Sequence, residues 1–311
     1  MILVAGRINV DTVIELESRI VCGGKTIAKS IHIFFGGSGL NAATAAKRFC
    51  GDRNSVALVG CLGNDEYRDR ILELIRREGI DLRYIDIVEG SCGRAYILLE
   101  PEGRVTIATY PGVNALCNLV RELEDFDIAI VTNPTPSIAE KILSKACDLS
   151  APVVMDFGTE WLRLKPVALK YSRRLDYCIV IPSDYEIDTS IGLEAAARRV
   201  AEELGCNVVV KRGAQGSYVY ELNGDEYHVP PLPLRDLGLS VVSTAGCGDT
   251  FTGVLGAALV EGYRLRQAVV LATIAAGIKA SRMDPRDAPR RREIMQIYTR
   301  LTKYFSGVES R

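Results

Sequence analysis

The segment Ser243–Phe251, with the sequence STAGCGDTF, carries the residues best suited to chemistry. A glycine-rich turn at Gly246 and Gly248 opens a helix there, and glycines let the backbone approach a ligand closely. The free N–H groups and the dipole at the start of a helix attract an anion. Asp249 lies at this positive end, where a carboxylate is either an ordinary helix-start residue or a general base beside a bound phosphate. The segment alone leaves both interpretations open.

Two other glycine motifs are rival phosphate or dinucleotide sites. The tripeptide at 24–26, GKT, resembles the end of a Walker phosphate loop, but Arg19 stands where that loop needs a glycine. Residues 37–42, GSGLNA, fit the GxGxxA dinucleotide fingerprint between a strand and a helix. The following strand, Val56–Gly60, does not end in the acidic residue that this fingerprint needs. The two motifs are therefore weaker candidates than the Asp249 segment.

A third set of polar residues could hold the hydroxyl groups of a ligand. Asp11 follows the first apolar strand, and Asn41 follows the glycine pair Gly36-Gly37. Ligands of open parallel sheets bind at the carboxyl ends of the strands. A carboxylate accepts two hydroxyl hydrogen bonds, and an amide both donates and accepts. Taken singly, Asp11 and Asn41 are also ordinary turn residues.

The elements that must position these residues alternate between strand and helix. Continuous apolar strands separated by amphipathic helices predict an α/β fold, in which a mainly parallel sheet has helices on both faces. The predicted strands are Ile2–Ala5, Val56–Gly60, Ile128–Thr132, Val153–Asp156, Tyr177–Ile181 and Val208–Lys211. The predicted helices are Leu40–Cys50, Glu66–Glu78, Ser137–Cys147, Leu193–Leu204, Gly248–Glu261 and Leu265–Ser281.

Two stretches in the first third of the chain interrupt this alternation. Val13–Phe35 and Arg94–Thr109 are typical of strands without intervening helices, and the second resembles a hairpin that turns at Pro101–Gly103. We expect them to pair into a small separate sheet, a lid formed by insertions at about 13–35 and 91–112. With no repeat or linker in the sequence, we interpret residues 1–311 as a single domain with this lid.

Length and charge exclude several classes of protein. The chain has 311 residues, and its 38 Lys and Arg balance 39 Asp and Glu to a net charge of −1. This balance argues against a nucleic-acid partner bound by phosphate neutralisation. No apolar run reaches the roughly 18–20 residues of a membrane helix, and the N-terminal apolar segment is too short for a signal peptide. With two histidines, a His-based triad or multi-His metal centre is excluded by number.

The nine cysteines are scattered, and no two have the spacing of a zinc motif. An odd, scattered set is typical of reduced, mostly buried thiols. We therefore expect a cytoplasmic protein with free cysteines, noting that some hyperthermophile proteins form intracellular disulfides.

Taken together, the motifs resemble those of the ribokinase, or PfkB, family of sugar and nucleoside kinases. GGSGLNAATAAKRF resembles the N-terminal GG-x-x-x-N signature, and STAGCGDTFTGVLGAAL resembles the C-terminal D-T-x-G-A-G-D signature, in the right order. Further matches lie between or before them: Asp11, the Gly63–Asp65 turn, Pro111–Asn114 and Val209–Gly216. The resemblance covers nearly the whole chain and implies a ribokinase-like three-layer sandwich.

The resemblance also implies a reaction and a set of site residues. Members of the family transfer the γ-phosphoryl group of ATP, as a magnesium complex, to a hydroxyl of a small sugar or nucleoside. By this resemblance Asp249 is the catalytic base, and the small sheet closes over the sugar. The remaining roles are an anion hole at Ala245, Gly246, Cys247 and Gly248; substrate binding by Asp11, Gly36, Gly37, Asn41 and Asn114; nucleotide binding by Lys211, Gly213, Gly216, Ala272 and Ala276; and magnesium binding through Glu186.

Three departures from the family pattern affect these expectations. Ser183 replaces the Asn of N-x-x-E, so magnesium would depend more on water. Ser243 replaces the first Asp of the C-terminal signature, a segment that helps to hold a monovalent cation in many relatives, and this puts potassium activation in doubt. Ser38 replaces the lysine of typical ribokinases, which weakens the case for ribose itself. For Lys211, a phosphate contact and a surface strand end are both open.

Several alternatives remain at this stage. The acceptor could be a furanose, the ribose of a nucleoside, or a hexose, sugar acid or polyol, and the donor could be ADP, GTP or pyrophosphate. A sugar or nucleotide sensor without turnover and a dinucleotide-dependent oxidoreductase are rival functions. Exposed lid edges would allow a homodimer. Finally, Cys247 begins a helix, which predicts a thiol of lowered pKa whose alkylation inactivates the protein.

Overall fold

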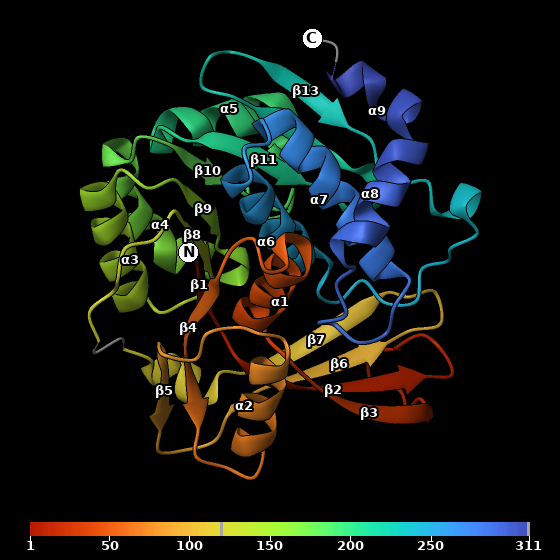
Figure 1. Ribbon diagram of the computed structural model, residues 1–311. Helices are drawn as coiled ribbons and strands as arrows, with labels where there is room; N and C mark the ends of the chain where they lie inside the picture. The colour runs from red at the N-terminus through yellow and green to blue at the C-terminus, as the bar shows by residue number, and fades with distance from the viewer. Residues whose placement is uncertain (119–120, 310–311) are drawn as a thin grey trace.

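The described residues, 1–118 and 121–309 of the computed structural model, form a nine-stranded sheet flanked by helices (Figure 1). Seven strands are parallel, and the hairpin of β12 and β13 adds two antiparallel strands at one edge. In spatial order the strands are β13 (Glu226–Val229), β12 (Ser217–Tyr220), β11 (Asn207–Lys211), β10 (Cys178–Val180), β9 (Val153–Asp156), β8 (Ile128–Thr132), β1 (Ile2–Gly6), β4 (Val56–Gly63) and β5 (Ile85–Val88).

Helices cover both faces of the sheet and enclose two separate hydrophobic cores. Along β1, alternate side chains enter opposite cores, Val4 on one face and Leu3 on the other, as the period of a strand requires. The first face is covered by α1 (Ser38–Cys50), α2 (Arg68–Arg77), α6 (Cys247–Val260), α7 (Leu265–Ala280), α8 (Arg291–Arg300) and α9 (Thr302–Glu309). The second is covered by α3 (Pro136–Leu149), α4 (Trp161–Tyr171) and α5 (Leu193–Leu204). The predicted α/β class, with a mainly parallel sheet between helices, is confirmed.

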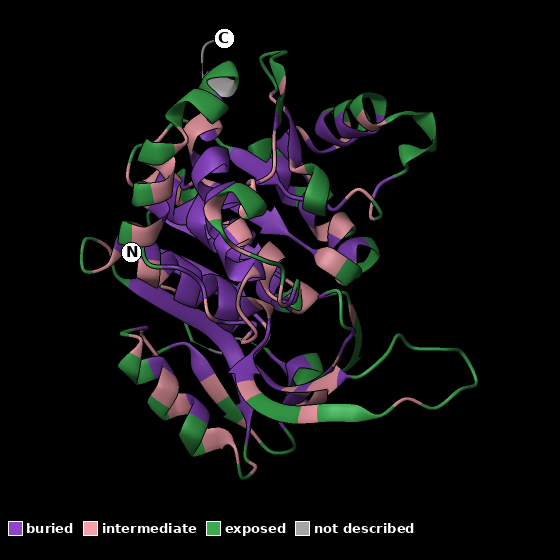
Figure 2. Cartoon of the chain, turned by 90° about the vertical axis from the view of Figure 1, so that its right-hand side faces the viewer, coloured by how far each residue is buried: buried purple, intermediate pink, exposed green. Residues whose placement is uncertain are grey.

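A second, four-stranded sheet lies beside the large one. Its order is β3 (Ala28–Gly36), β2 (Asn9–Leu16), β6 (Gly93–Leu99) and β7 (Val105–Tyr110). The two stretches expected to form the small sheet join through the parallel pair β2–β6, and both outer pairs are antiparallel. Much of its outer surface is exposed, whereas the large sheet is buried except at its edge strands (Figure 2).

The expectation that the cysteines are free is wrong for four of them. Disulfides join Cys61 to Cys117 and Cys178 to Cys206. Cys178 lies on β10 and Cys206 directly precedes β11, so the parallel pairing of these strands brings the two sulfurs together. Sequence spacing cannot show such a pairing, because the distance between the two residues is set by the fold.

No helix within residues 1–118 and 121–309 is long and apolar enough to cross a membrane.

Candidate active site

The start of α6 provides the anion-binding turn that the sequence predicts. Gly246 caps the helix in the left-handed region, with φ of 77°, and a Cβ atom there would lie 1.9 Å from the carbonyl oxygen of Pro285. Only glycine therefore fits this position. In the first helical turn the N–H of Cys247 donates to the carbonyl oxygen of Thr244 over 3.3 Å, so the N–H groups of Gly248 and Asp249 are the ones positioned to meet an anion.

Asp249 faces Asn41 across the interface of α6 and α1. The side-chain amide of Asn41 donates to Asp249 Oδ2 over 2.8 Å. The two helices approach closely because Gly253 faces the backbone of Ala42, where a Cβ atom would lie 2.2 Å from the carbonyl oxygen. Burial raises the pKa of Asp249, and the hydrogen bond from Asn41 opposes this rise. A carboxyl group in this environment holds a proton more tightly than an exposed one does, which suits a general base.

Asp11 and Asn41 converge on the same place and each leaves one acceptor without a partner. Asp11 Oδ1 and Asn41 Oδ1 are both buried, and neither accepts a hydrogen bond from any described residue. Gly36 leaves space between them, since a Cβ atom there would lie 2.2 Å from Asp11 Oδ2 and 2.9 Å from Asn41 Oδ1. Buried acceptors are normally satisfied, so this pair is suited to hydroxyl donors of a ligand.

The electrostatic environment of Asp11 is unfavourable to its charge. Burial raises its pKa well above the ordinary value, the carboxylates of Asp249 and Asp284 add to the rise, and the backbone N–H of Gly37 opposes it. Gly37 caps α1 with a φ of 91°. Burying this carboxylate without full hydrogen bonding destabilises the free protein, and the hydroxyl groups of a bound ligand would reduce that free-energy cost.

Asn114, predicted to bind substrate, uses both ends of its side chain within the protein. Its Oδ1 accepts from the N–H of Ile8, and its Nδ2 donates to the carbonyl oxygens of Ile8 and Pro111 and to Asn9 Oδ1. Through these hydrogen bonds to Ile8 and Asn9, Asn114 fixes the start of β2 and so helps to position Asp11.

Lys211 forms a buried ion pair with Asp156 next to Gly248. Its Nζ lies 2.6 Å from Asp156 Oδ2, which also accepts from Thr252 Oγ1 over 2.6 Å. A Cβ atom on Gly248 would lie 3.6 Å from Lys211 Nζ. Lys211 is thus an internal cation beside the anion-binding turn and not a surface strand end. The sequence analysis missed Asp156, although it ends the buried strand β9, the same signal that pointed to Asp11.

Glu186, the predicted magnesium residue, lies close enough to this group to interact with it. Its Oε2 accepts from the N–H of Ser183 over 2.8 Å. Burial raises the pKa of Glu186, and the charge of Lys211 opposes the rise while Asp156 adds to it. Within the described ranges no set of three or more His, Cys, Asp or Glu could hold a metal alone. This donor set fits Mg²⁺, which commonly binds through few carboxylates together with waters and substrate phosphates.

The predicted nucleotide residues are distributed over two regions. Gly213 and Gly216 bracket the turn between β11 and β12, both with positive φ, and the space around Gly213 is open. On α7, Ala276 is partly exposed, whereas Ala272 is fully buried in the hydrophobic core.

The expectation of a lowered pKa at Cys247 is wrong. Burial raises the pKa of its thiol to about 11, and the positive charge of Lys279 reduces this effect without reversing it. The thiol also lies 3.9 Å from the carbonyl oxygen of Ser243. Desolvation therefore outweighs the helix N-terminus, and Cys247 is not poised as a thiolate.

The small sheet packs directly on the anion-binding turn. Val13, Ala95, Ile97 and Leu99 form a hydrophobic cluster with Ala245, against which Met283 also packs. The carbonyl oxygen of Gly103, at the tip of the β6–β7 hairpin, lies 3.5 Å from Thr244 Oγ1. The sheet therefore covers the side of the site where Asp11 and Asn41 lie.

Comparison with known proteins agrees with this geometry. The chain matches the pfkB family carbohydrate kinases over residues 1–291. It is 26% identical to the ATP-dependent ribose-1-phosphate kinase of Halopiger xanaduensis, over 93% of this chain and 94% of that protein. The crystal structure of the ribokinase of Thermotoga maritima has a TM-score of 0.75 and 27% identity, over 96% and 99% of the two chains. A Burkholderia thailandensis nucleoside kinase in complex with inosine has a TM-score of 0.78 and 21% identity, over 97% of each chain.

The family match covers almost the whole described fold and both glycine signatures. The chain therefore belongs to the pfkB family of carbohydrate kinases. It is a kinase, and the resemblance inferred from its motifs is confirmed.

Proposed function

We propose that this protein transfers the γ-phosphoryl group of ATP to a hydroxyl of a furanose, either a free pentose or the ribose of a nucleoside. Asp249 takes the proton of the acceptor hydroxyl, whose oxygen forms the new bond to the γ-phosphorus as the bond to ADP breaks. The N–H groups at Gly246–Gly248 stabilise the charge on the transferred group. Positioning and electrostatics supply most of the acceleration in such a reaction.

The observation that carries the proposal is the pair of unsatisfied acceptors beside the base. Asp11 Oδ1 and Asn41 Oδ1 are buried without partners, and the amide of the same Asn41 donates to Asp249. A ligand with adjacent hydroxyl groups would satisfy both oxygens and present a further hydroxyl to Asp249. An acceptor with a single hydroxyl would leave one oxygen unsatisfied, at a cost of about 1–3 kcal/mol.

Magnesium would bind on the nucleotide side, with Glu186 holding its waters and Lys211 offsetting the phosphate charge. When bound, the ion supplies charge neutralisation for the β- and γ-phosphates. The ion pair of Lys211 with Asp156 holds the ammonium group beside Gly248. Gly213, Gly216 and Ala276 would line the nucleotide on the exposed side of the β11–β12 turn.

The test is a panel of acceptors offered with Mg·ATP, with products read by mass spectrometry. The panel holds D-ribose, inosine and other nucleosides, ribose 1-phosphate, hexoses and polyols. A phosphorylated product from a furanose, lost in Asp11→Asn, is expected. A product from hexoses or polyols alone, or none from any acceptor with ATP, ADP or GTP as donor, would contradict the proposal.

We also propose a homodimer formed through the outer face of the small sheet. Ile33 and Tyr96 flank Thr12 on this face and are 48% and 47% exposed. Ile107 is 47% exposed but shares the opposite face with Val13. Light scattering should give a dimer for the wild type and for Ile107→Lys, and a monomer for Ile33→Lys. A monomeric wild type would contradict this arrangement.

A further inference from the structure

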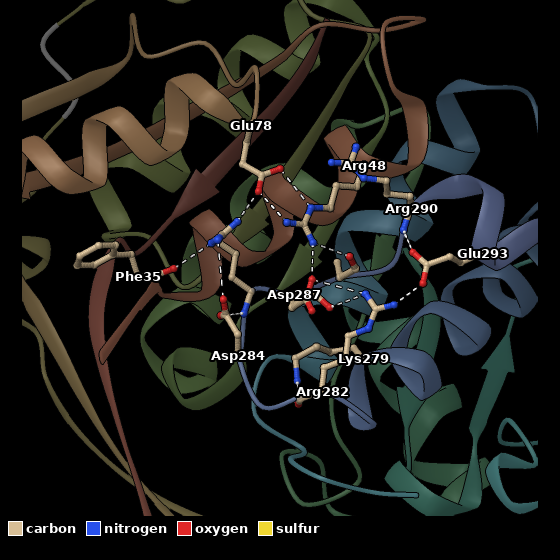
Figure 3. Close-up of polar contacts among 11 residues, drawn as sticks. Phe35, Arg48, Glu78, Lys279, Arg282, Asp284, Asp287, Arg290 and Glu293 are labelled. Carbon is tan, nitrogen blue, oxygen red and sulfur yellow. Dashed lines mark hydrogen bonds and ion pairs between the residues drawn. The ribbon is translucent and has the colours of Figure 1, made fainter. Parts of the chain in front are cut away.

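A buried lysine that the reaction above does not use lies behind the anion-binding turn. Lys279, in the last turn of α7, is 0% exposed and is among the largest fully buried side chains of the described residues. Figure 3 shows it next to the loop that carries Arg282, Asp284 and Asp287. Burying an ammonium group is costly unless its donors are satisfied, so its surroundings need an explanation.

The hydrogen bonds of Lys279 go to backbone carbonyl oxygens. Its Nζ donates to the carbonyl of Arg282 over 2.9 Å and to that of Ser243 over 3.5 Å. Ser243 is itself fully buried and begins the segment that leads into the anion hole. A small group of convergent carbonyl oxygens is the environment in which proteins hold a bare monovalent cation.

Both carbonyl-bearing segments are fixed in place by the surrounding structure. The N–H of Ser243 donates to the carbonyl of Ala280, and the Oγ of Ser243 accepts from the N–H of Ala245. On the other side, Arg286 donates to the carbonyl of Phe35 and pairs with Glu78. The same loop abuts Gly246 through the carbonyl of Pro285. The position of Lys279 is thus coupled to that of the turn.

The positive charge of Lys279 acts on the carboxylate of Asp249, the proposed base. It lowers the pKa of Asp249 against the larger raising effect of burial. Burial lowers the pKa of Lys279 itself, while Cys247, Asp284 and Asp287 act in the opposite direction. A fixed positive charge here adds to the helix dipole at the site where negative charge accumulates during phosphoryl transfer.

We infer that Lys279 is a built-in cation, a positioning residue that clamps Ser243 and Arg282 behind the anion hole and makes the kinase independent of potassium. The inference rests on the proposed phosphoryl transfer. The ammonium group occupies the space among the carbonyl oxygens that a monovalent cation would need. Removing the side chain should open that space to a small cation from solution.

The first test uses the unaltered protein and needs no acceptor. Thermal unfolding is followed in equal concentrations of potassium, methylammonium and choline chloride. The wild type should show the same Tm in all three salts. Lys279→Ala should be less stable in choline and be stabilised selectively by potassium or methylammonium, because a cation that binds only the folded state stabilises it. A potassium-specific rise in Tm of the wild type would overturn the inference.

The second test measures turnover with Mg·ATP and whichever of D-ribose, inosine or ribose 1-phosphate the wild type phosphorylates. Potassium should change wild-type kcat by less than about twofold. Lys279→Met should lower kcat by about tenfold or more with a small change in the acceptor KM. Methylammonium should restore part of the kcat of Lys279→Ala, a rescue that a merely structural role would not give.

Lys47→Met is the matched control. Lys47 also lies in the last turn of a helix and donates to a backbone carbonyl, that of Gly51, over 2.8 Å, but its ionic partner is Asp52 and not a residue of the turn. Its kcat should equal that of the wild type. Equal kcat for folded Lys279→Met and Lys47→Met, or strong activation of the wild type by potassium, would overturn the inference. Absence of turnover by the wild type would instead contradict the proposed function, and the unfolding test would still decide the role of Lys279.

Discussion

At the scale of single residues, the buried carboxylate of Asp249 determines how the reaction should respond to pH. Burial raises its pKa above the ordinary value, and a general base must be deprotonated to act. We therefore expect kcat to fall about tenfold per pH unit on the acidic side of that raised pKa. Asn41 stabilises the ionised form, so Asn41→Leu should move this acidic limb to higher pH. A pH–rate profile whose acidic limb is unchanged in Asn41→Leu would contradict this assignment.

The buried charge of Asp11 should lower the stability of the folded protein while its carboxylate binds the acceptor. Its pKa is raised in the folded protein by burial and by Asp249 and Asp284, so the folded state binds the proton more tightly than the unfolded state does. Stability is therefore lost as pH rises from the ordinary Asp value through the raised one. Asp11→Asn removes the charge, and its Tm near neutral pH should rise by about 1–2 °C for each kcal/mol recovered.

The same variant should lose acceptor binding, seen as a large rise in the acceptor KM with ATP binding retained. Thermal unfolding and steady-state kinetics measured on one preparation provide the check. A lower Tm together with an unchanged acceptor KM would show that Asp11 is an ordinary structural residue.

Sequence reasoning identified most of this site because its residues follow strict local rules. Gly246 needs a left-handed φ, and Asp249 lies at a helix start, so both are visible in the sequence. Lys279 was missed because its role depends on hydrogen bonds to the carbonyl groups of Ser243 and Arg282, which only the fold brings next to it. A lone lysine within the otherwise apolar end of α7 was the available signal.

At the scale of elements, the two glycines of the turn into α6, Gly246 and Gly248, should respond differently to substitution by alanine. At Gly246, φ is positive and a Cβ atom would collide with the Pro285 carbonyl, so Gly246→Ala should cost about 2 kcal/mol or more in the free energy of unfolding. At Gly248 the nearest atom is Lys211 Nζ at 3.6 Å, so Gly248→Ala should fold normally.

Gly248→Ala should nevertheless lower kcat, since the added methyl group points toward the cation beside the anion hole. Denaturant unfolding and kinetics on both variants give the comparison. A Gly248→Ala protein with wild-type kcat would mean that this side of the turn does not face the transferred group.

The elements that were not predicted lack a strong local pattern. α4 contains Pro166 in its interior, where proline normally breaks a helix. β13, with the sequence EYHV, is a largely exposed edge strand without clear alternation. In contrast, α5 has the predicted bounds Leu193–Leu204, because its apolar face has a clear helical period.

At the scale of the whole molecule, the two disulfides should contribute measurably to stability. They link residues 56 and 28 positions apart, and loops of this size correspond to roughly 3–5 kcal/mol each in the chain-entropy account. Reduction with a strong thiol should lower Tm by several degrees. Alkylation of the denatured, unreduced protein should modify five cysteines, Cys22, Cys50, Cys92, Cys147 and Cys247. Modification of all nine would contradict the pairing.

The central claim is that Asp249 is the base of a phosphoryl transfer to a sugar hydroxyl. The most direct measurement compares wild type and Asp249→Asn in the formation of phosphorylated product from Mg·ATP and the accepted furanose, with binding of Mg·ATP measured in parallel. The account predicts product with the wild type and a loss of kcat of about 10²–10⁴-fold in Asp249→Asn, with nucleotide binding retained. Equal product formation by the two proteins would contradict it.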